Sequence, residues 1–215
     1  MTLSPEIINL FKLGSGVFWS LTYLLIIRRG FKDRTFGMPL VALCANISWE
    51  FIFSFVHPHQ PPQLYVDITW FLLDTLIVYQ LLHYGRQAFD RLLPGAMFYA
   101  FFLVSMVLSF AVVLGISIEL NNWSGTYAAF GQNLMMSILF VLMLRTRDDL
   151  SGQSMYIAVF KMIGTLLPSI LVFLLYPTSF LMNTLYLSIF LFDILYIGML
   201  YSKHRELGLQ PWRRF

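Results

Sequence analysis

The chain has 215 residues, of which 58% are hydrophobic and only 12% are charged. Soluble domains carry about 25% charged residues, so the composition excludes an ordinary water-soluble globule and predicts a chain embedded in lipid. The net charge of +3 does not indicate a nucleic-acid-binding surface, and a single cysteine, Cys44, excludes a disulfide framework or a cysteine-based metal site within one chain.

Seven predominantly apolar stretches follow one another along the chain. A spanning helix needs roughly 20 such residues, so the sequence predicts an all-α bundle of seven transmembrane helices in a single domain, residues 1–215. Pro168 predicts a kink in the sixth helix. The predicted spans are Ile7–Ile27, Phe36–Val56, Leu64–Leu82, Leu92–Ile118, Asn121–Leu144, Met155–Tyr176 and Thr178–Ser202.

The basic residues lie on alternate connections between these spans. Because Lys and Arg favour the cytoplasmic side, the pattern predicts an N-terminus outside, a cytoplasmic C-terminus, and a multi-pass protein of the bacterial inner membrane or the endoplasmic reticulum. Lys12 and Lys161 fall elsewhere, each near enough to a helix end to extend to the interface. The other twelve are Arg28, Arg29, Lys32, Arg34, Arg86, Arg91, Arg145, Arg147, Lys203, Arg205, Arg213 and Arg214.

The third and seventh spans resemble each other. Residues 71–86 and 190–205 are identical at six of sixteen positions, with Asp74 and Asp193 each twelve residues before an Arg. The first and fifth spans are alike more weakly. The pattern predicts a 3+1+3 parallel repeat, residues 7–91 and 121–215, with a linker helix at 92–118. Chance matching between leucine-rich helices is the alternative.

Three carboxyl groups, those of Glu50, Asp74 and Asp193, are predicted to lie deep in the bilayer. At 1.5 Å per residue, Asp74 and Asp193 lie roughly 18 Å from their cytoplasmic Arg residues, in the same layer as Glu50. A carboxylate there costs about 2.5–3.5 kcal/mol on insertion scales, so such residues usually have a function.

Lys161 is expected near the cytoplasmic side, which leaves the three acids without a cation. Low dielectric disfavours the charged form, so we expect at least one acid to keep its proton beside an ionised partner, as a general acid beside a general base. The alternative is that each acid hydrogen-bonds a neighbouring helix and only stabilises packing.

Aromatic and amide side chains stand at helical spacing around the three acids. Aromatic faces stabilise cations, by about 2 kcal/mol or more when desolvated, so the layer suits a cationic intermediate. Rings facing lipid or core are the alternative, and the amides of Gln132 and Asn133 could instead join helices. The residues predicted to contact substrate are Asn46, Trp49, Trp70, Asn133 and Tyr196.

Several other chemistries find no support, and we expect no metal and no cofactor. The pair Asp148–Asp149 lacks a third acid at Mg²⁺-binding spacing. His57 and His59 supply only two ligands, and the seventh span has no lysine for a retinal Schiff base. Asp67 and Glu119 are expected at solvated helix ends.

The segment NISWEF, with its pair Trp49–Glu50, and the lone Asp193 of the seventh span resemble the integral-membrane terpene cyclases. These belong to fungal meroterpenoid and indole-diterpene pathways and to bacterial drimentine-type pathways. The resemblance implies a metal-independent cyclase that protonates an olefin or epoxide of a prenyl chain on an aromatic or heterocyclic head. Rings then close through carbocations, and a base removes the last proton.

By the same resemblance, Glu50 and Asp193 match the family's acids in the second and seventh helices, while Asp74 is added from its position alone. We therefore expect Glu50 to donate the proton and the two Asp residues to serve as partner or terminal base, with a prenylated small molecule as substrate. A small-solute or proton-coupled transporter of 3+1+3 type is the alternative, and a heptahelical receptor or assembly factor is a third. A cyclase makes an isomer of its substrate, whereas a transporter moves it unchanged. Chain length, head group and oligomeric state stay open.

Overall fold

The computed structural model describes residues 4–89 and 94–215, and the secondary structure within these ranges is helical. The predicted start of the fourth span at Leu92, the basic residue Arg91 and the repeat boundary between them lie outside the described residues. The elements are α1 Pro5–Asp33, α2 Leu40–Phe51, the π-helical η1 Ile52–Val56, α3 Gln63–Phe89, α4 Gly95–Glu119, α5 Thr126–Thr146, α6 Met155–Leu175, α7 Phe180–Glu206 and the short η2 Pro211–Arg213.

Six of the described helices are long and apolar enough to cross a membrane. The second apolar helix, formed by α2 and η1 over residues 40–56, is shorter than the others. Helix α6 continues through Pro168 to Leu175. The prediction of an all-α integral membrane protein is confirmed in this form.

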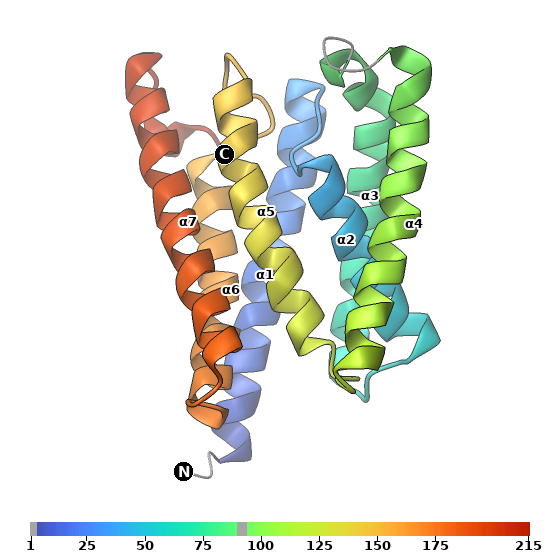
Figure 1. Cartoon of the computed structure of the whole chain (residues 1–215). Coiled ribbons are helices and arrows are strands. Elements are labelled where there is room, and N and C mark those ends of the chain that lie inside the picture. The colour runs from blue at the N-terminus through green and yellow to red at the C-terminus, as the bar shows by residue number, and fades with distance from the viewer. Residues whose placement is uncertain (1–3, 90–93) are drawn as a thin grey trace.

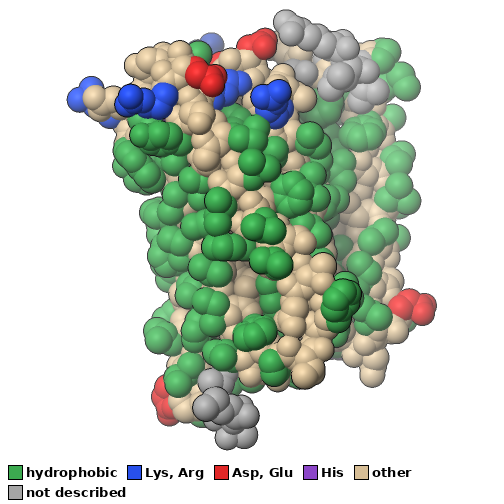
Figure 2. All heavy atoms as spheres, turned by 60° about the vertical axis from the view of Figure 1, so that its left-hand side comes forward, with side chains coloured by type: hydrophobic (Ala, Val, Ile, Leu, Met, Phe, Trp, Pro, Cys, Tyr) green, Lys and Arg blue, Asp and Glu red, His purple; other side chains and the backbone are tan. Residues whose placement is uncertain are grey.

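The surface of the bundle is apolar, as lipid contact requires. Leu103, Val107 and Val112 of α4 are each close to 60% exposed. On the face that Figure 2 presents, hydrophobic side chains cover the middle of the molecule and Lys and Arg side chains gather at one end. A soluble protein rarely exposes so large an apolar surface.

The helices α1 to α7 form two layers (Figure 1), with α6, α1 and α3 in one and α7, α5, α2 and α4 in the other. The layers join where α6 packs on α7 and where α3 packs on α2. Between these two contacts, α1 packs against α6 and α3 of its own layer rather than against α2 or α5 of the other layer. The backbones therefore leave room at the centre of the bundle, where side chains decide what is filled.

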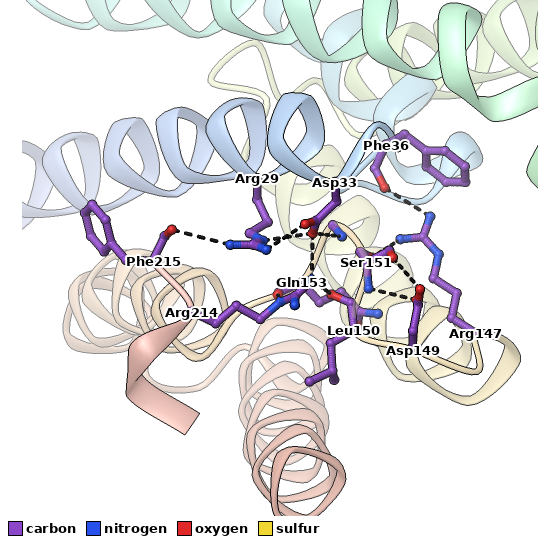
Figure 3. Close-up of polar contacts among 11 residues, drawn as sticks. Arg29, Asp33, Phe36, Arg147, Asp149, Leu150, Ser151, Gln153, Arg214 and Phe215 are labelled. Carbon is purple, nitrogen blue, oxygen red and sulfur yellow. Dashed lines mark hydrogen bonds and ion pairs between the residues drawn. The ribbon is translucent and has the colours of Figure 1, made fainter. Parts of the chain in front are cut away.

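One end of the bundle, which we call the basic end, is closed by polar contacts centred on Asp33 at the end of α1 (Figure 3). The Asp33 carboxylate accepts hydrogen bonds from Arg29, from Arg214 at 2.7 Å and from the backbone N–H of Gly152 at 2.9 Å. These contacts join α1, the α5–α6 connection and the segment after α7.

Arg147 and Asp149 extend the same contacts across the α5–α6 connection. Arg147 donates to the carbonyl of Phe36 at 3.0 Å and to that of Ser151, and its guanidinium lies 4.5 Å from the centre of the Phe36 ring. Burial opposes ionisation of Asp149, but hydrogen bonds from Ser151 and the charge of Arg147 outweigh it and lower the pKa of Asp149. The basic end is therefore closed by hydrogen bonds and ion pairs that join separate parts of the chain.

Candidate active site

A cavity of about 880 Å³, here called the central cavity, occupies the space between α1, α2, α3, α5 and α6. Glu6, Asn9, Lys12 and Gln60 line it where it is exposed, at the end opposite the basic end. Its inner part is lined by buried side chains such as Glu50, which is 1% exposed. Ligand cavities are typically about 300–1,000 Å³, so the space suits a molecule with a long apolar chain.

Four side chains at the inner end form the acid cluster: Tyr23 of α1, Asn46 and Glu50 of α2, and Asp74 of α3. The Tyr23 hydroxyl donates to Glu50 Oε1 at 2.9 Å. Asn46 Nδ2 lies 3.0 Å from the same oxygen and 2.8 Å from Asp74 Oδ2. Asn46 and Glu50 are one helical turn apart, which places both on the face of α2 that meets α3.

One neutral amide thus bridges two carboxyl groups. Gln132 of α5 donates to Asn46 Oδ1 at 3.3 Å, which turns the NH₂ group of Asn46 toward the acids. Within the described part of the chain, no Lys or Arg contacts either acid, and Glu50 Oε2 and Asp74 Oδ1 have no hydrogen-bond partner. Two carboxyl groups so close disfavour double ionisation, so the pair favours holding one proton.

Aromatic rings line the cavity beside Glu50. Trp49 is anchored by its indole N–H, which donates to the carbonyl of Gly125 at 2.9 Å, and Trp70 donates to Ser20 Oγ at 3.1 Å. Gly125 has a φ of 63°, and a Cβ there would lie 2.4 Å from the Phe53 ring, so only glycine fits this close approach.

The ring of Tyr23 packs between two tryptophan rings, those of Trp19 and Trp70. Its ring centre lies 5.7 Å from that of Trp19 and 6.2 Å from that of Trp70. The electron-rich faces of such rings attract cations, most strongly where water is excluded.

Asp193 lies apart from the acid cluster. It accepts a 2.7 Å hydrogen bond from Lys161 Nζ, and both side chains are almost fully buried. It lines a different cavity of about 370 Å³ between α6 and α7, the lateral cavity, which shares only Thr165 with the central one. The expectation that all three acids share one chamber without a cation is therefore wrong for Asp193.

The position of Lys161 explains this error. Lys161 is the seventh residue of α6, about two turns from Met155 at the basic end. Its side chain was therefore expected to extend outward to the membrane interface. Instead the flexible stem carries the ammonium inward, where it also donates to Ser137 Oγ at 2.7 Å. A long side chain can be directed either way, and the carboxylate on α7 decides the direction.

Of the five residues predicted to contact substrate, four line the central cavity and one does not. Asn46, Trp49, Trp70 and Asn133 line the central cavity, as expected for substrate contact. Tyr196 lines neither cavity, because its hydroxyl donates to Gln153 at 3.0 Å within the buried core.

Two further expectations concern acids away from the cavity walls. Asp74 is buried without lining the central cavity, and its carboxyl group contacts Asn46. Asp67 was expected at a solvated helix end but is 0% exposed, because His59 and Gln63 enclose its carboxylate.

The sequence arguments missed Tyr23, Trp19 and His59, all of which line the central cavity. Only acids were tested for depth. Tyr23 lies ten residues before Asp33, or roughly 15 Å along α1, and the same rule would have placed its hydroxyl near the acids. No such signal exists for His59, whose position depends on how the α2–α3 connection folds.

The whole bundle matches a known family profile. Residues 3–206 match the family described as Pyr4-like transmembrane terpene cyclases. The chain belongs to this family. The resemblance noted from Trp49–Glu50 and Asp193 is thereby confirmed.

Curated members of the family are similar over much of the chain. The chain is 32% identical over 154 residues to the Pyr4-family terpene cyclase mfmH of Annulohypoxylon moriforme, covering 70% of this chain and 64% of the relative. It is 29% identical over 164 residues to the terpene cyclase pyr4 of Aspergillus fumigatus, covering 71% and 65%. It is 27% identical over 176 residues to the asnovolin H synthase nvfL of Aspergillus novofumigatus, covering 76% and 69%.

The chain thus spans slightly less than two thirds of the first two relatives' lengths. No solved structure matches the chain.

Proposed function

We propose that this protein is a membrane-embedded, metal-independent terpene cyclase that acts on a prenylated meroterpenoid or indole substrate. One observation carries the proposal: an amide-bridged pair of carboxyl groups, Glu50 and Asp74, at the inner end of an aromatic-lined cavity of about 880 Å³. The family membership supports it, as do relatives named as terpene cyclases.

Glu50 donates the initiating proton in the proposed mechanism. Its Oε2, which has no partner among the described residues, carries the proton to the olefin or epoxide at the far end of the prenyl chain. Tyr23 and Asn46 then hold the remaining negative charge through their hydrogen bonds to Oε1. Asp74, hydrogen-bonded to Asn46, places a second carboxyl group beside Glu50, and two neighbouring carboxyl groups favour holding a proton before each turnover.

The carbocation that follows moves along the prenyl chain as rings close. Trp19, Tyr23, Trp49 and Trp70 face it with their π-systems and present no strong nucleophile, so the cation survives until it loses a proton. The contacts around Asp33 close the basic end against water.

The substrate enters with its prenyl chain first. The exposed part of the cavity carries the charged and polar side chains Glu6, Asn9, Lys12 and Gln60 beside Leu10 and Leu13, whereas the aromatic rings gather in the inner part with Glu50. A head group with hydroxyl or N–H functions therefore stays near the exposed end, and the end of the chain reaches the acid.

The proposed topology has seven transmembrane helices in a single domain, with the N-terminus outside and the basic end cytoplasmic. The membrane is the bacterial inner membrane or the endoplasmic reticulum. The packing supports a 3+1+3 repeat: α1 packs on α6 as α2 packs on α5, and α1 packs on α3 as α5 packs on α7. Under this symmetry Asp74 of α3 corresponds to Asp193 of α7.

Asp193 supports the site in this proposal rather than initiating the reaction. Its pairing with Lys161, which also bonds Ser137, ties α5, α6 and α7 together. Asn133 and Thr165 connect this assembly to the central cavity through a 3.1 Å hydrogen bond. The transporter alternative has no comparable support, since the family and its named members are cyclases.

Membranes containing the protein test the proposal with a panel of farnesylated and geranylgeranylated phenols and indoles, each with and without a terminal epoxide. A cyclase yields a cyclic product of the substrate's mass. In D₂O an olefin-initiated product gains one carbon-bound deuterium, whereas an epoxide-initiated one gains only exchangeable deuterium on its new hydroxyl. Vesicles that only move such compounds unchanged would overturn the proposal.

A further inference from the structure

The reaction proposed above needs a base that takes the final proton, and the deep acids are poorly placed for it. Asp193 is held by Lys161 and lines the lateral cavity, and Asp74 lines no cavity. Glu50 lies at the inner end, where the first proton is delivered. The final cation forms nearer the head group, toward the exposed end of the central cavity.

His59 lines the central cavity next to Gln60, near the exposed end, and its side chain is 15% exposed. His59 Nδ1 lies 2.7 Å from Asp67 Oδ2. Gln63 donates to the other oxygen, Asp67 Oδ1, at 2.8 Å. With a carboxylate as its acceptor, Nδ1 carries the hydrogen of the neutral imidazole, so Nε2 presents a lone pair.

Asp67 is suited to hold this arrangement. It is fully buried in the second turn of α3. Both of its oxygens are occupied by His59 and Gln63, so the carboxylate has one orientation. A buried carboxylate in contact with an imidazole stabilises the imidazolium that forms when the ring takes up a proton.

The imidazole ring is fixed from its faces as well. It stacks on Phe53 with ring centres 4.7 Å apart and planes 6° apart, and it lies 5.7 Å from Trp49. The His59 backbone N–H donates to the carbonyl of Phe53 at 3.0 Å. The exposed His57 on the same loop also stacks on a ring, that of Trp123, but only His59 combines such stacking with a buried carboxylate partner.

We infer that His59 is the terminal base of the cyclisation and that Asp67 is its positioning residue; this rests on the proposed function. His59 Nε2 takes a proton from a carbon next to the cationic centre, and the electrons of that C–H bond become the new C=C bond. The imidazolium, balanced by Asp67, returns the proton to water at the exposed end. Glu50 regains one from water, so the overall reaction is an isomerisation.

The substitution His59→Gln tests the inference, with His57→Gln as the matched control. His57 lies on the same loop but is exposed and stacks on Trp123 instead. We expect the His59→Gln variant to consume the panel compound that the unsubstituted protein cyclises at a rate within about tenfold of the unsubstituted rate, because Glu50 still donates the first proton. The normal product should fall to a minor fraction, replaced by olefin isomers and by products of water addition. His57→Gln should keep the normal product.

Asp67→Asn should shift the product ratio in the same direction but less, and it carries the test if His59→Gln does not accumulate in membranes. In His59→Gly, added imidazole should restore the normal product, whereas pyrazole, similar in shape but a far weaker base, should not. An unchanged product ratio in His59→Gln or Asp67→Asn would overturn the inference, as would equal rescue by pyrazole. Failure of the proposed function is distinguishable, because no compound would then be cyclised by the unsubstituted protein.

Discussion

The two three-helix units of the proposed repeat, α1–α3 and α5–α7, each carry one buried aspartate on their last helix, Asp74 and Asp193, and the two aspartates have different partners. In the first unit Asp74 receives a hydrogen bond from the neutral amide of Asn46, which also contacts Glu50. In the second, Asp193 receives one from the ammonium of Lys161, which also contacts Ser137. Both donors come from the middle helix of their unit.

In the proposed mechanism this difference assigns proton transfer to the first unit and a supporting role to the second. A neutral donor leaves the carboxyl pair of the first unit free to hold and release a proton, next to a cavity that can accept it. Asp193, by contrast, is held in an ion pair that ties α6 to α7, away from the central cavity. Under this proposal, burial of a carboxyl group in a membrane does not by itself mark an acid catalyst, and the charge of its partner has to be considered as well.

Glu50→Gln should have the largest effect, because it removes the proposed proton while preserving shape and hydrogen bonding. We expect product formation in membranes to fall by about 10²–10⁴-fold, the usual contribution of general acid catalysis. Mass-spectrometric assay of the cyclic product measures this. Glu119→Gln, at the end of α4, serves as a control that should change little. Undiminished turnover in Glu50→Gln would show that Glu50 does not donate the initiating proton.

Lys161→Met tests the second unit through stability. Breaking a buried ion pair by removing one partner costs about 3–5 kcal/mol, so the variant should be poorly accumulated and melt early in detergent. Lys161→Met combined with Asp193→Leu removes both charges and should recover most of that stability. Thermal unfolding followed by size-exclusion chromatography measures both variants.

The double variant also decides the role of Asp193. Recovered folding with retained cyclisation agrees with a supporting role. A well-folded double variant without activity would instead place Asp193 in the reaction itself.

Asp74→Asn should have an intermediate effect, because the amide still fills the space but no longer carries charge beside Asn46. We expect roughly ten- to hundredfold slower turnover with unchanged substrate affinity, since Asp74 lines no part of the central cavity and acts on the protonation of Glu50. Kinetics over a range of substrate concentrations separates the two quantities. A change in affinity alone would contradict this role.

Asp33→Asn should have the smallest effect on chemistry. It weakens the contacts with Arg29, Arg214 and Gly152 at the basic end, worth about 1–3 kcal/mol for hydrogen bonds to a charged group. We expect a lower melting temperature with turnover per folded molecule unchanged. Asp148→Asn, an exposed neighbour of the same network, is the matched control. Equal effects of the two variants would argue against this stabilising role.

The sequence predicted much of the first unit and less of the second. Glu50, Asn46, Trp49 and Trp70 were found because residues one turn apart on a helix share a face, which is a local property. Lys161 and Tyr196 were misplaced because the direction of a long side chain depends on which helix lies beside it. The His59–Asp67 contact joins a loop to a helix start, and no local pattern predicts it.

The sequence by itself determined that this chain is embedded in lipid and that its helices are apolar, since both follow from composition. It also determined that three acids lie deep, since this follows from the rise of a helix. Only the tertiary structure decided which acid meets an amide, which meets a cation and which faces the central cavity. Those outcomes depend on contacts between helices far apart in sequence, such as α6 with α7, and the energy of a buried charge is set by its neighbours in space.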